Sequence, residues 1–250
     1  MCAYFAPAFV YGGPPRSIFG LCRAQRDAGV DVRVITTTAN GDSELSDAVV
    51  ARGEYEGIPV RYCARAWPRS IFHAPSLGAA VAAALRDADV LHIHGLWNAA
   101  VWSAAAAARQ ERKPYVLSPR GMLAPAALAH DKWRKKLVYP LADRRVIRDA
   151  ARLHATSRGE FEALDHLPEA GRAVYVPNGV ELPPGAVQPG LADLRQLLAA
   201  LPQRDRLGEA VPALLEASYH LDQLVARLLV RQLLAGVAPG VLLRHCRSLR

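Results

Sequence analysis

Short apolar runs alternate with helical patterns along the first 183 residues of the chain. The segment 90–94 reads Val-Leu-His-Ile-His and is largely apolar, as a strand buried on both faces should be. The alanine-rich segment 99–109 that follows predicts a helix, because alanine is the best helix former. Further strands are predicted at 30–34, 58–62, 115–118, 153–156 and 173–176, and further helices after Gly13, after Ser76, over 131–149 and after Ser157. Strands that alternate with helices pair in parallel, so the pattern predicts an α/β fold: a mainly parallel sheet with helices on both faces.

The pattern changes near residue 183. Pro183, Pro184 and Gly185 are typical of a linker or turn, and the residues after them contain no convincing strand. The segments 191–201 and 207–234 are rich in Leu, Ala and Arg and are helical in pattern. We therefore expect one domain over 1–183 and an atypical tail over 184–250 that is helical or disordered.

Composition and charge narrow the classes of function. The formal charge of +8 favours anionic partners, but nearly all of it is arginine in an alanine-rich chain, which a GC-rich gene would also produce. No nucleic-acid-binding motif is present, so nucleic acid is not an expected partner. The four cysteines are scattered without metal-ligand spacing, which predicts no metal site and fits a reducing cytoplasm. Neither a signal peptide nor an apolar run of about eighteen residues is evident.

Ligands of parallel α/β sheets bind at the carboxyl ends of the strands, so the residues after each strand are candidates. Gly12 and Gly13 precede a predicted helix, where backbone N–H groups could approach a phosphate. Arg16 falls in the first turn of that helix, where a cation is tolerable if an anion binds there. The alternative is a plain tight turn.

The strand over 90–94 ends in a second group of candidates. Alternation places His92 and His94 on one face, and His94 falls at the strand end, where it could reach a substrate hydroxyl. Trp97 offers a flat face on which a sugar or lipid could stack. The two histidines could ligate a metal, but no third ligand has suitable spacing nearby. A purely structural histidine is the alternative.

Three more strand ends carry polar residues. Arg120, followed by Gly121, could clamp a phosphate through two parallel hydrogen bonds. Ser157 and Glu160 have the spacing of a helix capping box. Asn178 and Gly179 follow the last strand. The alternatives are that Arg120 is an ordinary surface arginine, that Ser157 and Glu160 only cap a helix, and that Asn178 and Gly179 only form a turn.

The order of these motifs resembles glycosyltransferase family 4, retaining enzymes with two Rossmann-like domains that form the GT-B fold. The resemblance covers Tyr4 to about Pro183 and rests on segments 4–7 with 12–14, 89–97, 117–123, 153–157 with Glu160, and 176–180. The Ser-Pro-Arg-Gly-Met-Leu form of 118–123 is similar to enzymes that build bacterial exopolysaccharide, O-antigen or related surface glycans. The chain thus resembles the N-terminal, acceptor-side half of such an enzyme.

The resemblance implies transfer of a sugar from a nucleotide-diphosphate donor to the hydroxyl of a glycan or lipid-linked acceptor, with retention and without a bound cofactor or metal. His94 and Arg120 would line the acceptor side as the catalytic candidates. The further substrate or donor-phosphate contacts would be Gly12, Gly13, Arg16, Trp97, Gly121, Ser157, Glu160, Asn178 and Gly179.

Two departures from the family pattern stand out. Most of the first strand, which would be central in the sheet, is missing before Tyr4, and its loss would leave neighbouring groups uncovered. The donor-side Gly-Arg-x-x-x-x-Lys-Gly segment and paired glutamates eight positions apart are also not recognisable; Glu209 and Glu216 are seven apart. We therefore expect a truncated chain that is inactive alone, which leaves its own enzymatic activity open. The alternative is a non-catalytic acceptor- or membrane-binding module that pairs with a separate donor-binding chain.

One basic segment suggests a membrane surface. Lys132, Trp133, Lys135 and Lys136 combine cations with an aromatic residue, as interfacial helices on anionic lipid do, although Pro140 would kink or split the helix. A solvated charged face is the alternative. These features predict a cytoplasmic protein, either free or peripheral at the inner membrane face.

Overall fold

The computed structural model describes residues 1–124 and 142–179. The basic residues 132–136 and the tail 184–250 lie outside the described residues, so the expectations about membrane contact and about the tail stay predictions.

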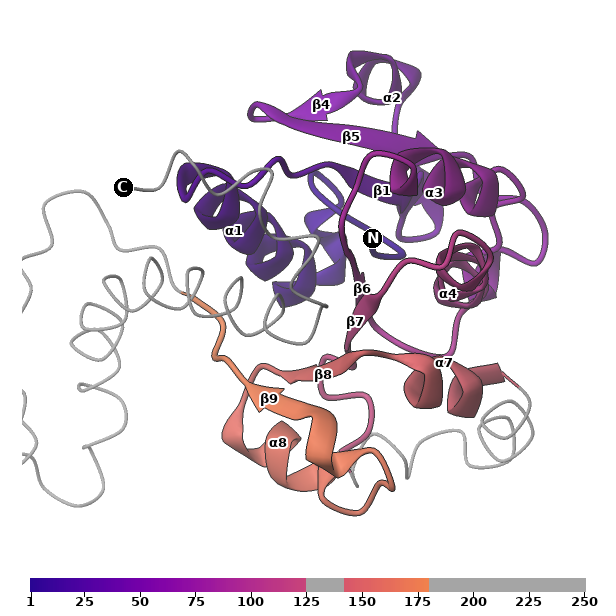
Figure 1. Cartoon of the computed structure of the whole chain (residues 1–250). Coiled ribbons are helices and arrows are strands. Elements are labelled where there is room, and N and C mark those ends of the chain that lie inside the picture. The colour runs from indigo at the N-terminus through magenta and orange to yellow at the C-terminus, as the bar shows by residue number, and fades with distance from the viewer. Residues whose placement is uncertain (125–141, 180–250) are drawn as a thin grey trace, which may run out of the picture.

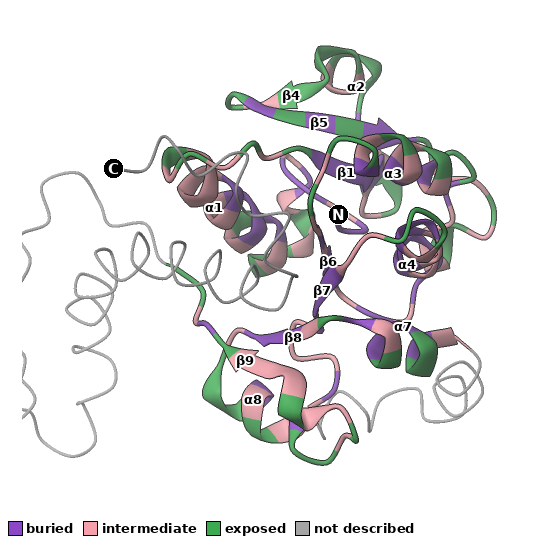
Figure 2. Cartoon of the chain, in the orientation of Figure 1, coloured by how far each residue is buried: buried purple, intermediate pink, exposed green. Residues whose placement is uncertain are grey.

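The sheet that carries the candidate residues has four parallel strands. They are β6 (Leu91–His94), β7 (Tyr115–Ser118), β8 (Arg152–Ala155) and β9 (Ala173–Tyr175), paired in that order. The register places His94 opposite Ser118 and His154 opposite Val174. Figure 2 shows β6, β7 and β8 largely buried, whereas β9 is only partly buried. The predicted α/β fold class is confirmed.

A second set of strands lies beside the first. β1 (Val34–Thr37) pairs in parallel with β5 (Ile58–Cys63), and β4 (Glu54–Tyr55) adds an antiparallel edge. β2 (Ala39–Asn40) and β3 (Ser43–Glu44) form a short hairpin after β1.

Residues 1–3 join the two sets of strands. Cys2 forms a parallel bridge with His94, and its N–H donates to the carbonyl of Ile35 at 3.2 Å. The N–H of His94 donates to the carbonyl of Met1 at 3.0 Å. In Figure 1 the N-terminus lies accordingly between β1 and β6. The place that was expected to be uncovered is therefore filled by three buried residues.

Helices alternate with the strands, and all of the described ones except α2 were predicted. They are α1 (Gly13–Asp27), α2 (Asp47–Arg52), α3 (Leu77–Leu85), α4 (Ala99–Gln110), α7 (Arg144–Asp149) and α8 (Arg158–Leu164), with 3₁₀ turns at Phe9–Tyr11, Arg69–Ile71 and Ala170–Arg172. Figure 1 shows α1 on one side of the strands and α3, α4 and α7 on the other. None of the helices in the described ranges is both long and apolar enough to cross a bilayer.

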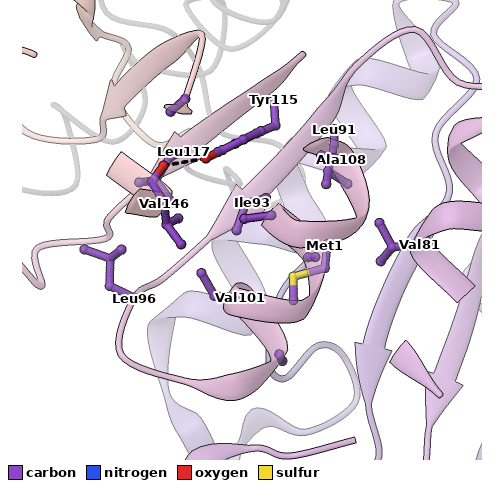
Figure 3. Packing of buried hydrophobic residues seen from close by; sticks show 14 of the residues in the cluster. Met1, Val81, Leu91, Ile93, Leu96, Val101, Ala108, Tyr115, Leu117 and Val146 are labelled. Atoms are coloured by element: carbon purple, nitrogen blue, oxygen red, sulfur yellow. Dashed lines mark hydrogen bonds between the residues drawn. The ribbon is translucent and has the colours of Figure 1, made fainter. Parts of the chain in front are cut away.

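The main core lies between the four-stranded sheet and the alanine-rich helix α4. Ile93 and Leu117 are fully buried there, and Ala104 and Ala108 of α4 allow the helix to pack closely. Figure 3 shows the Tyr115 hydroxyl, which donates to the Val146 carbonyl at 2.6 Å and so ties β7 to α7. A buried aromatic ring thereby keeps its one polar atom satisfied.

One predicted boundary was wrong. The strand expected over 30–34 begins at Val34 and runs to Thr37, because its partner β5 would place Pro59 opposite Arg33, and proline has no N–H for the ladder. The predicted helix over 131–149 is described only at its end, as α7. Neither α2 nor β4 was predicted.

Candidate functional site

The guanidinium of Arg120 contacts side chains from three separate segments of the chain. Its Nε and Nη2 lie 3.3 and 3.1 Å from Nδ1 of His94, at the end of β6. Its Nη1 donates to Ser17 Oγ of α1 at 3.3 Å and to Asn178 Oδ1, after β9, at 2.6 Å. Arg120 itself follows β7, so the carboxyl ends of the parallel strands meet at this one cation, as the strand-end rule predicts.

The backbone at Arg120 is unusual. Its φ is 57°, a left-handed value that is uncommon for a residue with a side chain, and Gly121 follows with φ 75°. Nothing lies within 4 Å of where a Cβ on Gly121 would be. The turn therefore holds two successive left-handed residues beside open space.

The ring of His94 is neutral and has a defined tautomer. A guanidinium has only donors, so Nδ1 of His94 must accept and Nε2 carries the proton. Burial first, and then the nearby His92 and Arg120, hold the pKa of His94 well below its usual value. His94 can therefore donate a hydrogen bond from Nε2 at neutral pH without being charged.

Two more histidines continue from His94. The His92 and His94 ring centroids are 4.1 Å apart, so both rings lie on one face of β6, as predicted. His154 of β8 lies 3.3 Å from His92 (Nδ1 to Nε2), and its Nε2 donates to the Val176 carbonyl at 2.9 Å. Burial lowers the pKa of His154 to about 4. Within the described residues, no group of three His, Cys, Asp or Glu residues could hold a metal ion.

Glu160 joins this site from α8. Its Oε1 accepts the N–H of Gly121 at 2.7 Å, and its Oε2 accepts the N–H and Oγ1–H of Thr156 at 2.7 and 2.9 Å. Ser157 caps the same helix by accepting the N–H of Glu160 at 3.1 Å. Half of the predicted capping box is thus present, while the carboxylate reaches Thr156 and Gly121 in place of the N–H of Ser157.

The loop after β6 is fixed by buried polar groups. Asn98 caps α4 by accepting the N–H of Val101 at 3.0 Å. Asp143 Oδ1 accepts the N–H of Trp97 and Nε1–H of Trp102. Burial raises the pKa of Asp143. Trp97 is partly buried beside the core, so its ring is partly used for packing.

The glycine loop is exposed at the start of α1. Gly12 has φ 79° and ψ −128°, a conformation that essentially only glycine adopts, and an added Cβ would meet nothing within 4 Å at Gly12 or Gly13. Ser17, one turn later, reaches Arg120. Arg16 is exposed, and its guanidinium lies 4.4 Å from the Phe9 ring centroid. Asn178 and Gly179 are also exposed.

The comparisons with known proteins identify the family. The family model of the glycosyl transferase 4-like domain matches residues 12–179, more than half of the chain. The chain belongs to this glycosyl transferase 4-like family. The comparison with curated proteins gave no match.

Solved structures similar to this glycosyl transferase 4-like chain include three of one protein from Anabaena, Alr3699/HepE. The complex with UDP and glucose has a TM-score of 0.47 and 16% identity, covering 89% of this chain and 70% of that chain. The complex with UDP-glucose has a TM-score of 0.46 and 19% identity, covering 84% of this chain and 49% of that chain. The complex with UDP has a TM-score of 0.43 and 17% identity, covering 85% of this chain and 69% of that chain.

The structure of this glycosyl transferase 4-like domain brings together part of the predicted set. Direct hydrogen bonds link His94, Arg120 and Asn178, and Gly121 is linked through Glu160. The other predicted residues have different contacts: Arg16 packs on Phe9, Ser157 caps α8, and the N–H of Trp97 donates to Asp143. Sequence reasoning missed Ser17 and His154, since a helical serine and a strand histidine carry no signal until the strands are paired.

Proposed function

We propose that this domain is the acceptor-side half of a retaining glycosyltransferase that takes its sugar from a nucleotide-diphosphate donor. The observation that carries the proposal is the Arg120 guanidinium, which is held by His94, Ser17 and Asn178 where the strands end. These three partners are neutral, so none of them compensates the positive charge of Arg120. That is the arrangement an anionic leaving group requires.

The chemistry divides between two side chains. Arg120 would stabilise the negative charge that develops on the departing diphosphate, because its donors are fixed before the reaction. His94, neutral with a proton on Nε2, would hold the acceptor hydroxyl by a hydrogen bond rather than by charge. The backbone of Gly12, Gly13 and Gly121 would let phosphate oxygens approach closely, and Arg16, Trp97, Asn178 and Gly179 would supply outer contacts.

Transfer also requires a grip on the nucleotide. Orientation of the reacting atoms can supply roughly 7–11 kcal/mol of barrier lowering, so a donor that is not oriented reacts slowly. The sequence after Val180 has no recognisable donor-side motif. We therefore propose that a second, donor-binding domain or chain completes a GT-B enzyme, and that this chain alone transfers no sugar.

The proposed acceptor is a surface glycan or a lipid-linked precursor in polysaccharide biosynthesis. Its lipid would place the protein peripherally on the inner membrane face, with Lys132, Trp133, Lys135 and Lys136 toward anionic headgroups. The rival function, a non-catalytic module that holds an acceptor or lipid surface, keeps the membrane contact but needs no donor.

Calorimetry with a panel of nucleotide-diphosphate sugars tests the proposal. We expect weak binding that falls about tenfold or more in Arg120→Lys, which loses the planar fork, and that is unchanged in Arg158→Lys, an exposed arginine on α8. Turnover should be undetectable for the chain alone and appear with a donor-binding partner. Equal donor affinity in wild type and Arg120→Lys would contradict the proposal, and no donor binding in the wild type would favour the module.

A further inference from the structure

The carboxylate of Glu160 is a buried anion with all its contacts inside the protein. Glu160 is only 3% exposed, and its two oxygens accept three hydrogen bonds, from Thr156 and Gly121. A negatively charged group placed there would also repel a diphosphate. Direct contact with the donor is therefore a poor use of Glu160, although its position in the sequence motif suggests it.

The bond to Gly121 fixes the turn from which Arg120 projects. The peptide that joins Arg120 to Gly121 carries the N–H that Glu160 accepts, so the carboxylate sets the orientation of that peptide plane. Both residues have positive φ, which is costly for Arg120 and persists only where the surroundings impose it. Thr156 anchors the other carboxylate oxygen to the end of β8.

The side chain of Arg120 depends on this turn. From its left-handed backbone the guanidinium reaches His94, Ser17 and Asn178. A shift of Arg120 to a relaxed, negative φ would redirect its Cβ and withdraw the guanidinium from these partners. Burial lowers the pKa of Arg120, and the nearby Glu160 carboxylate acts in the opposite direction by favouring the charged guanidinium.

We propose that Glu160 is a positioning residue, which holds the Arg120–Gly121 turn so that the Arg120 guanidinium stays on His94 and presents its charge to an anionic ligand. The inference rests on the proposed function only in taking that ligand to be the diphosphate of the donor. The competing view is that Glu160 merely stabilises the start of α8, in which case its loss would weaken the helix and leave Arg120 in place.

The first test uses the full chain and does not depend on ligand binding. Glu160→Gln leaves a single acceptor oxygen for three donors, so we expect the turn to relax and His94 Nδ1 to lose its bond to Arg120. The ¹⁵N signal of that ring nitrogen should move toward the value it has in Arg120→Lys. The control Glu162→Gln, on the exposed side of the same helix, should leave it unchanged. An unmoved His94 signal in folded Glu160→Gln would overturn the proposal.

The second test measures binding of inorganic pyrophosphate. Glu160→Gln should weaken pyrophosphate binding about tenfold. The double variant Glu160→Gln/Arg120→Lys should bind no more weakly than Arg120→Lys alone, because each substitution removes the same contact between the Arg120 guanidinium and the anion. Additive losses would overturn the proposal. If the wild type binds no pyrophosphate, the proposed function fails while the His94 signal still decides the role of Glu160. Should Glu160→Gln not fold, Thr156→Val removes only one of the three bonds and should move His94 in the same direction by less.

Discussion

At the residue scale, the buried ring of His154 makes stability depend on pH. Its pKa falls to about 4 in the folded protein because burial disfavours the charged ring, whereas an unfolded histidine has a pKa near 6.5. Between these values the unfolded chain binds a proton that the folded chain does not. His154 alone should therefore lower the free energy of unfolding by about 2 kcal/mol as the pH falls from 7 to 5.

Urea denaturation at the two pH values measures this contribution. His154→Gln, which removes the titrating group, should be less stable at pH 7 but should lose about 2 kcal/mol less than wild type on going to pH 5. His166→Gln, at an exposed position, is the matched control and should follow the wild type. Identical pH slopes for wild type and His154→Gln would contradict the prediction.

The sequence located the principal residues of the site but not their partners. Strand-end reasoning found His94 and Arg120, because a polar residue directly after an apolar strand is visible in the sequence. It could not find Ser17, which comes from a helix more than a hundred residues away from Arg120. It also could not foresee that Glu160 would turn its carboxylate to Gly121, since the left-handed backbone there has no sequence signal at an arginine.

At the element scale, Asn98 determines how α4 begins. Its side chain accepts the N–H of Val101 and donates to the carbonyl of Leu96, so one buried amide closes the loop between β6 and the helix. Asn98→Ala should cost about 1–2 kcal/mol in the free energy of unfolding, while Asn98→Ser should retain most of the cap. Denaturant titration of both variants measures it, and equal losses would argue against a capping role.

Glycines in the helices and loops differ in what a side chain would meet. A Cβ on Gly78 of α3 would lie 3.8 Å from the Ser103 side chain, an ordinary contact, whereas Gly95 has φ 91°. Gly78→Ala should therefore stabilise the domain by about 0.5 kcal/mol, and Gly95→Ala should destabilise it by about 1–3 kcal/mol. Thermal unfolding of the pair checks this, and a destabilised Gly78→Ala would show that α3 and α4 cannot accommodate a methyl group.

Element types were easier to predict than element ends. The apolar run before His94 and the alanine-rich stretch after Asn98 gave β6 and α4 nearly to the residue. The alternation of Val30, Val32 and Val34 predicted a strand that begins too early, because the register with β5 places Pro59 opposite Arg33 and β1 begins only at Val34. Short elements such as α2, which ends at the left-handed residue Gly53, depend on tertiary contacts rather than on a hydrophobic pattern in the sequence.

At the scale of the whole molecule, residues 1–3 form a seam between two hydrophobic clusters. One cluster lies around β6 to β8 and α4, and the other around α1, β1 and β5. Met1 and Ala3 belong to the first and Cys2 to the second. The Arg120 site spans the same seam, because Ser17 lies on α1 and His94 on β6. Stability and site geometry should therefore respond together when the seam is weakened.

Thr37 offers the sharpest test of that coupling. Its buried hydroxyl donates to the carbonyl of Ala3 and accepts the N–H of Ala39, so Thr37→Val leaves both groups without this partner. We expect a loss of about 2 kcal/mol in the free energy of unfolding and faster exchange of the His94 amide, which pairs with residue 1. Thr36→Val is the matched control: it is equally buried, and its hydroxyl accepts only from the Cys2 thiol at 3.9 Å, so about 0.5 kcal/mol should be lost. If both variants lose the same stability, or if Thr37→Val leaves His94 exchange unchanged, the two clusters are not coupled through residues 1–3.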